Sequence, residues 1–187
     1  MRQSDFQPVE FELSFGGRDG HLPAITVREG GASLSVSGKV DRVDGWLKDG
    51  KLFLRVVDYK TGSKKLDLKE VYCGLDCQML LYLFSLTRDG SGRFTGAEPA
   101  GVLYLLADPA PENTTRANAA RSVEYKLDGL VRDEQKLFRA MDADETGRYL
   151  PFSYLRGVPS PYQKDKRADI AKLNRIQLHL DDLVTRM

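Results

Sequence analysis

The fold is decided by residues 38–62, which read GKVDRVDGWLKDGKLFLRVVDYKTG. The dipeptide Asp49-Gly50 is a strong signal for a two-residue hairpin turn, and β-branched and apolar residues flank it on both sides. With this dipeptide as the turn, Asp44 faces Arg55 across the hairpin, which is a favourable cross-strand charge pair. The sequence therefore predicts an antiparallel hairpin whose register follows from its turn.

The same register makes Asp41 face Asp58 at the end of the hairpin distant from the turn. Lys60 lies two residues beyond Asp58, so its side chain projects from the same face. Two directly opposed carboxylates repel each other unless a cation lies between them. Mg²⁺ accepts a few carboxylate ligands together with water and phosphate oxygens, and a nearby ammonium can orient a water molecule or stabilise a phosphorane. We therefore expect a metal site here rather than three ordinary surface side chains, provided that no bulge shifts the register.

The flanking segments predict a mixed α/β or α+β domain, because strands precede a helix, another strand and further helices. The expected strands are Val9–Phe15, Ala24–Glu29, Ser33–Leu47, Lys51–Lys60 and Ala100–Ala107. The expected helices are Leu68–Leu86, with Val71, Leu75, Met79, Tyr82 and Leu86 on one side, Arg132–Met141 and Lys164–Met187. Asp108–Arg121 is polar and interrupted by prolines, which favours a loop. No repeat or interdomain linker is visible, so we expect one domain over residues 1–187.

Composition excludes several classes of protein. The chain has 28 Lys and Arg against 27 Asp and Glu, a net charge of +1, so attraction to nucleic acid must come from a local patch. No run of about 18 apolar residues is present, and Met1–Asp5 lacks the apolar core of a signal peptide. With two cysteines, the sequence predicts a cytoplasmic protein with no membrane partner.

Three short stretches resemble the motifs of a known nuclease family. Gly38–Asp44, Val57–Gly62, and Gln78 with Tyr82 on the next helix resemble those of the PD-(D/E)XK superfamily. Within it, they are most similar to the nuclease domain of AddB/RexB-type subunits of bacterial helicase–nucleases. Phe11–Gly16 and Pro99–Tyr104 occur in the order that family shows, so the resemblance covers roughly residues 6–154. It implies a restriction-endonuclease-like core, a mixed β-sheet flanked by helices.

The resemblance also implies residue roles. Asp41 and Asp58 would bind Mg²⁺, or Mn²⁺ in its place, with the Tyr59 carbonyl as a further ligand. Lys60 would be the catalytic lysine, and Gln78 with Tyr82 would match the family's Q-x-x-x-Y motif near the DNA backbone. The alternative for this last pair is an exposed amide and a core tyrosine. The basic residues expected to contact DNA beside Tyr82 are Arg42, Lys64 and Lys65.

The sequence departs from the family pattern in three respects. The family has a metal-facing histidine upstream, whereas His21 and His179 here are expected to be surface or structural residues; Glu12 is the first candidate to replace that ligand. Cys73 and Cys77 cannot complete the four-cysteine iron–sulfur cluster of AddB proteins, so we expect no cluster and treat both as small buried residues. The family's subunit is also far longer, so we expect this chain to be a piece of one.

Three functions remain open at this point. The first is a Mg²⁺-dependent DNA exonuclease domain of an ATP-dependent helicase–nuclease that resects double-strand breaks for recombinational repair. Its partners would be linear DNA with single-strand ends and a second helicase–nuclease subunit. The second function is a non-catalytic domain that docks a helicase partner. The third is a Mg²⁺-dependent phosphatase or other phosphodiesterase, although no phosphate-binding glycine loop is present.

Overall fold

A computed structural model describes residues 3–16, 22, 24–29, 32–62, 65–89, 93–108 and 124–186 of the chain. Within these residues the centre of the fold is a six-stranded mixed sheet with the strand order β1-β4-β5-β6-β7-β10. Its strands are β1 (Gln7–Phe15), β4 (Gly38–Lys48), β5 (Lys51–Thr61), β6 (Glu98–Asp108), β7 (Glu124–Arg132) and β10 (Arg167–Ala168). The remaining elements are β2 (Ile25–Glu29), β3 (Ala32–Val36), α1 (Leu68–Tyr72), α2 (Gln78–Asp89), α3 (Gln135–Met141), β8 (Tyr154–Leu155), β9 (Val158–Pro159), the 3-10 helix η1 (Pro161–Lys166) and α4 (Ile170–Arg186). The predicted mixed sheet flanked by helices is confirmed.

The β4–β5 hairpin has the predicted turn and register. Asp49 and Gly50 both have positive φ angles, of 51° and 74°, as a hairpin turn matching the twist of its strands requires. Pairing runs without interruption from Lys48–Lys51 to Arg42–Val57. Local turn chemistry therefore sets the register of the two strands that carry the candidate site.

Strands β5 and β6 are parallel, and α1 and α2 form the connection between them. The single helix expected over Leu68–Leu86 is wrong, because the chain breaks it between Tyr72 and Gln78. Gly74 has a φ of 80° in this break, a left-handed conformation that ends the helical hydrogen-bonding pattern. Leu75, expected on the buried side, is consequently 60% exposed.

The C-terminal half also differs from the expectation. Strand β7 was not predicted, and the expected helix over Arg132–Met141 is confined to α3. The expected helix over Lys164–Met187 is divided among η1, β10 and α4. The loop expected over Asp108–Arg121 lies, beyond Asp108, outside the described residues.

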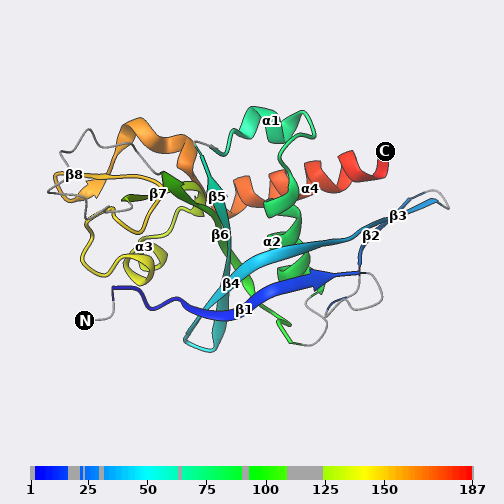
Figure 1. Cartoon of the computed structure of the whole chain (residues 1–187), viewed down its shortest axis with the longest axis horizontal. Helices are drawn as coiled ribbons and strands as arrows, with labels where there is room; N and C mark the ends of the chain where they lie inside the picture. The colour runs from blue at the N-terminus through cyan, green and yellow to red at the C-terminus, as the bar shows by residue number, and fades with distance from the viewer. Residues whose placement is uncertain are drawn as a thin grey trace, which may run out of the picture.

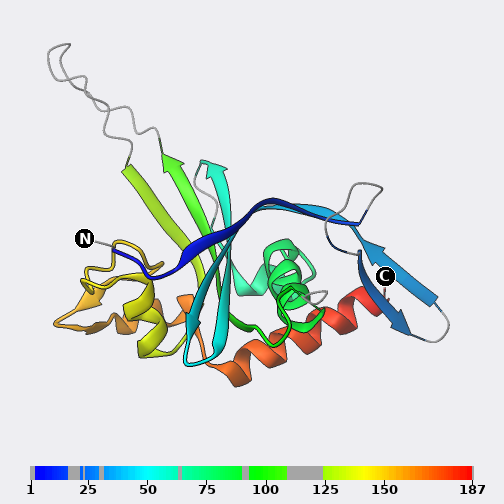
Figure 2. The same cartoon turned by 90° about the horizontal axis from the view of Figure 1, so that it is seen from below.

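Helices cover both faces of the sheet. Figure 2 shows α2 and α4 on one side and α3 on the other. The first hydrophobic core joins β4, β5 and β6 to α2 and α4, and the second joins β5 and β6 to α3. The β2–β3 hairpin extends from one end of the molecule, opposite β8 (Figure 1). Among the described residues no helix is long and apolar enough to cross a membrane.

Candidate active site

Asp41 lies where β4 becomes irregular. Val40 and Val43 both contribute to the first hydrophobic core, although residues three apart on a regular strand face opposite ways. The regular pairing of β4 with β5 stops at Arg42, and Asp41 is not part of the paired register. Instead, the backbone N–H of Tyr59 donates a hydrogen bond of 3.0 Å to Oδ2 of Asp41. The carboxylate of Asp41 therefore lies against β5 one residue beyond Asp58.

Asp58 and Lys60 share one face of β5. Nζ of Lys60 is 2.6 Å from Oδ2 of Asp58, whose side chain is only 16% exposed. The two groups form an ion pair, and this buried oxygen has no other partner within the described part of the chain. A carboxylate oxygen has two lone pairs, so a buried one with a single partner can take a further ligand such as water or an ion.

These oxygen donors fit a hard divalent cation. The N–H and C=O groups of one strand residue point to the same side, so the Tyr59 carbonyl faces β4, where its N–H meets Asp41. Two carboxylates and a carbonyl leave room for the water and phosphate ligands that Mg²⁺ usually keeps. No group of three or more His, Cys, Asp or Glu that could hold a metal occurs among the described residues. Glu12 therefore does not complete the set, and it forms an ion pair with Lys39 of β4 instead.

Arg42 belongs to a buried ionic network beside the site. Its Nε and Nη2 lie 2.5 and 2.9 Å from the two carboxylate oxygens of Asp44, and its Nη1 donates to the Tyr59 hydroxyl at 3.2 Å. Partial burial lowers the pKa of Arg42, but the hydrogen bonds to Asp44 and Tyr59 outweigh it and raise the pKa above its ordinary value. Asp44 is completely buried and also accepts from Nε of Arg55 at 2.9 Å, as the predicted cross-strand pair requires. Any contact of Arg42 with DNA must coexist with these bonds.

Gln78 and Tyr82 form a pair at the start of α2. The Gln78 side chain is exposed and its Nε2 donates a 2.7 Å hydrogen bond to the Tyr82 hydroxyl. Tyr82 is 2% exposed, and its ring is stacked on Phe15 with centroids 5.2 Å apart. Gly38 leaves space for the hydroxyl, because a Cβ at that position would overlap it. Gln78 is thus the member of the pair that can reach a substrate, with its carbonyl oxygen and second N–H still available.

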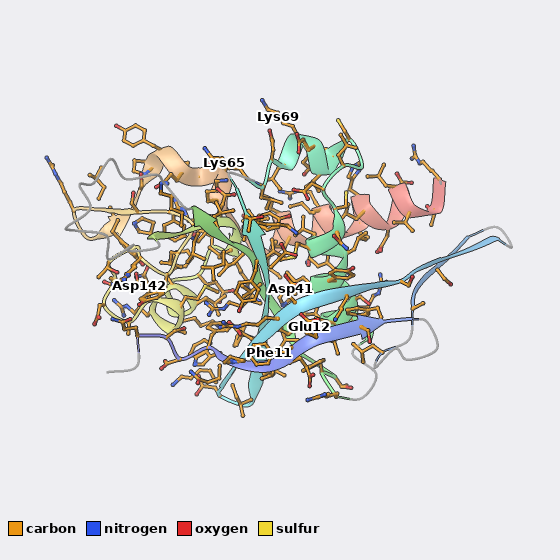
Figure 3. All side chains as sticks on the ribbon, in the orientation of Figure 1. Phe11, Glu12, Asp41, Lys65, Lys69 and Asp142 are labelled. Carbon is orange, nitrogen blue, oxygen red and sulfur yellow. The ribbon has the colours of Figure 1, made fainter. Side chains whose placement is uncertain are left out.

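The other residues predicted from the sequence are dispersed. Lys65 is exposed near the end of β5, whereas Lys64 and His21 lie outside the described residues (Figure 3). His179 is a structural residue of α4, with its Nε2 3.0 Å from the Tyr72 carbonyl oxygen.

The two cysteines lie in the turn between α1 and α2 rather than within one helix. The expectation that both are buried is wrong for Cys73, which is exposed because Gly74 turns the chain here, while Cys77 is half-buried. Burial raises the pKa of the Cys77 thiol, and the nearby Asp76 carboxylate raises it further.

Sequence reasoning missed a row of polar side chains across three strands. Asp58 pairs with Tyr104 of β6, and Tyr104 pairs with Asp128 of β7, so all three lie on one face. The Tyr104 hydroxyl donates to Asp76 at 3.2 Å. Burial raises the pKa of Tyr104, and the carboxylates of Asp76, Asp58 and Asp128 raise it further. Tyr104 ends one of the stretches that resemble the nuclease family, but Asp128 is on the strand that was not predicted.

Comparison with known proteins places the chain in a family. The model of the PD-(D/E)XK nuclease superfamily matches residues 1–180. The B subunit of the ATP-dependent helicase/deoxyribonuclease of Oceanobacillus iheyensis is 36% identical over 194 residues, covering 98% of this chain and 17% of the relative. The protein of the same name from Bacillus pumilus is 41% identical over 189 residues, covering 95% of this chain and 16% of the relative.

The corresponding protein of Bacillus subtilis, which has the same name, is 39% identical over 149 residues, which cover 75% of this chain and 13% of the relative. The chain thus spans 13% to 17% of the length of these three relatives. A six-stranded mixed sheet flanked by helices is consistent with a restriction-endonuclease-like core. The chain belongs to the PD-(D/E)XK nuclease superfamily.

Proposed function

We propose that this chain is a Mg²⁺-dependent DNA exonuclease domain that works within a longer helicase–nuclease subunit. The observation that carries the proposal is the buried Oδ2 of Asp58, whose one partner among the described residues is Nζ of Lys60, 2.6 Å away. Asp41 brings a second carboxylate to the next residue of the same strand. A buried carboxylate held beside an ammonium and a second acid is an arrangement suited to phosphodiester hydrolysis.

Each residue has a distinct task in this proposal. Asp41, Asp58 and the Tyr59 carbonyl would hold the cation, for which Mn²⁺ can substitute in the test tube. When bound, Mg²⁺ supplies positive charge and lowers the pKa of a water ligand. Lys60 is 33% exposed at its side chain, so its ammonium can also meet a water molecule or a phosphate oxygen. It would thereby stabilise the negative charge that develops in the transition state.

Gln78 would position the DNA backbone. A hydrogen bond of 2.7 Å to the Tyr82 hydroxyl fixes the amide of Gln78. The Tyr82 ring is itself immobilised, because it is stacked on Phe15. Holding the substrate in line lowers the entropy cost of the reaction. Tyr82 would act on DNA through Gln78 rather than by direct contact, since its ring is 2% exposed. Lys64, Lys65 and Arg42 remain the proposed basic contacts.

The relatives supply the setting of the proposal. Proteins named as B subunits of ATP-dependent helicase/deoxyribonucleases match most of this chain. We therefore propose linear DNA with single-strand ends as substrate, a second helicase–nuclease subunit as partner, and resection of double-strand breaks in the cytoplasm as the process. The phosphatase alternative has no supporting feature among the described residues, and docking without catalysis is an outcome of the test below.

The test is a cleavage assay with end-labelled DNA and the 187-residue chain. Linear DNA should be shortened progressively from its ends in Mg²⁺ and remain intact in EDTA, whereas a closed circle of the same sequence should persist. Asp58→Ala should behave as the wild type does in EDTA. Cleavage of the circle would contradict the exonuclease assignment. Absence of cleavage both by the chain and by the longer subunit with its partner would leave docking as the function.

A further inference from the structure

Residues 148–167, RYLPFSYLRGVPSPYQKDKR, form a local concentration of positive charge. They include five Lys and Arg, one Asp and three Tyr in a chain whose net charge is only +1. Two of the cations are engaged internally: Lys166 pairs with Asp128 at 2.8 Å and Arg167 with Asp133 at 3.5 Å. Arg156 and Lys164 are exposed, and neither forms an ion pair with another described residue.

Internal bonds fix this segment beside the candidate active site. Nζ of Lys166, the last residue of η1, donates to Oδ1 of Asp128 at 2.9 Å and to the carbonyl oxygen of Leu66 at 3.3 Å. The Leu66 N–H donates to the same Asp128 oxygen at 2.8 Å. Leu66 follows β5 closely in the chain, and Asp128 lies two strands from Asp58 in the cross-strand row, about 10 Å away at ordinary strand spacing. These bonds therefore attach η1 to the segment that follows β5, the strand of Asp58 and Lys60.

Tyr162 projects into solvent from this fixed turn. Its side chain is 86% exposed, more than any other large hydrophobic side chain among the described residues. The backbone beneath it is held by Ser160, whose Oγ accepts from the Tyr162 N–H at 3.4 Å. Beside it, Gln163 Oε1 accepts from the N–H of Ser153 at 2.9 Å. An aromatic ring presented on an ordered backbone is suited to stacking against a flat apolar partner.

We propose that Arg156, Tyr162 and Lys164, here named the η1 surface, bind single-stranded DNA on its way to the active site. Tyr162 would stack on a base, and the two cations would contact phosphates of the same strand. The inference rests on the proposed nuclease function, since it names a binding surface for that substrate. Aromatic rings combined with basic side chains are the usual means of binding single strands without sequence preference.

The positive charge of the surface, from Arg156 and Lys164, favours DNA over a protein partner. Lysine is depleted in the cores of protein interfaces, whereas it contributes directly to phosphate binding. The one acidic residue of the segment, Asp165, lies 3.9 Å from Nζ of Lys166, so its charge is partly offset. Leu155 and Val158, which are 47% and 58% exposed on the adjacent β8–β9 hairpin, offer apolar contact for sugars and bases.

The test measures binding of a labelled oligo-dT by fluorescence anisotropy, in EDTA so that nothing is cleaved, with the 187-residue chain. Tyr162→Ala should weaken binding about tenfold, which is typical of losing one base–aromatic stack, while Tyr162→Phe should bind as the wild type does. Lys164→Ala should reduce the slope of log K against log salt by about 0.7, the value for one phosphate contact on a single strand. Affinity for a blunt duplex should change little with Tyr162→Ala, because stacked bases in a duplex are not accessible to the ring.

Matched controls lie on α4, away from the η1 surface. Leu178 is 68% exposed and Arg175 is exposed, so Leu178→Ala and Arg175→Ala remove comparable apolar and basic groups and should leave binding unchanged. Equal affinity of Tyr162→Ala and wild type for oligo-dT would overturn the inference and assign the surface to a protein contact. If Tyr162→Ala weakens binding but neither the chain nor the longer subunit with its partner cleaves DNA in Mg²⁺, the inference stands and the nuclease proposal fails.

Discussion

Nζ of Lys60 lies 2.6 Å from Oδ2 of Asp58, two residues earlier on the same strand. The strand period makes this contact possible, because side chains two residues apart share a face. The ammonium offsets the charge of a carboxylate whose Oδ2 has no other partner in the described part of the chain. In the proposed function, a cation bound to this carboxylate would take the place of the ammonium, and Lys60 would then be available to the substrate.

Replacement of Lys60 should separate chemistry from binding. Lys60→Ala should slow cleavage of linear DNA by about two to four orders of magnitude, as expected for loss of one preorganised electrostatic donor, with DNA affinity nearly unchanged. Single-turnover cleavage and anisotropy measure the two properties. Lys39→Ala is the matched control, because Lys39 is an exposed lysine of β4 paired with Glu12. Normal cleavage by Lys60→Ala would make Lys60 an ordinary surface residue.

Binding of Mg²⁺ without DNA should be weak. Among the described residues no third acidic or histidine side chain joins Asp41 and Asp58, and Mg²⁺ gives up its water reluctantly. Calorimetric titration should therefore show little heat with the free chain and a clear signal when DNA phosphates are present. The free chain could instead bind Mg²⁺ tightly, with Glu12→Gln having no effect and Asp58→Asn abolishing binding. That result would show that a residue outside the described part supplies the missing ligand.

Gly38 should be intolerant of any side chain. A Cβ at Gly38 would overlap the Tyr82 hydroxyl, and the Tyr82 ring is fixed by its stack on Phe15. Gly38→Ala should reduce the free energy of unfolding by about 1–3 kcal/mol, the usual cost of overpacking. Urea denaturation measures it. Tyr82→Phe removes the nearest clashing atom, so the double variant should lose less stability than the two single variants together.

The hairpin could be predicted because its information is local. Asp49-Gly50 sets the turn, and the turn sets the pairing as far as Arg42–Val57. The position of Asp41 could not be predicted in the same way, because β4 changes phase between Val40 and Val43 while pairing with β1 on its other side. The register was predicted from β4 and β5 alone, so it could not include the effect of β1 on the course of β4.

The rest of the site depends on contacts between distant segments. Strand β7 contains Asp128 and Gly129, residue types that disfavour strands, and most of its second half is buried, which removes the alternation that identifies a strand. Without β7 the row from Asp58 through Tyr104 to Asp128 could not be predicted. The break at Gly74 was likewise hidden, because the apolar spacing of the two helices continues across it.

Asp44 should be the most sensitive acidic residue for stability. It is completely buried and contacts the guanidinium of Arg55 at 2.8 Å and that of Arg42 at 2.5 Å. Asp44→Ala leaves a buried guanidinium without its counter-charge, so the free energy of unfolding should fall by about 3–5 kcal/mol. Urea denaturation of Lys51→Ala, which breaks the exposed pair with Glu98, gives the control and should show a loss below about 1 kcal/mol. Equal losses in the two variants would contradict the importance of burial.

Tyr104 should make stability fall at alkaline pH. Its pKa is raised in the folded protein by burial and by the Asp76, Asp58 and Asp128 carboxylates, so the folded state retains the phenol proton. An unfolded tyrosine loses that proton near pH 10. The contribution of the neutral phenol is therefore fully present below about pH 10 and is lost as the pH rises above it, by up to about 1.4 kcal/mol per pH unit.

Comparison of the wild type with Tyr104→Phe isolates this effect, because ionisation of lysines and of the other tyrosines is common to both proteins. Urea denaturation between pH 8 and pH 11 should give a constant difference up to about pH 10. This difference includes the hydrogen bond from Tyr104 to Asp76 at 3.2 Å, which should contribute about 1.5–3 kcal/mol because the acceptor is charged. Above that pH the advantage of the wild type should shrink, whereas a difference that stays constant to pH 11 would mean that the phenol ionises equally in both states.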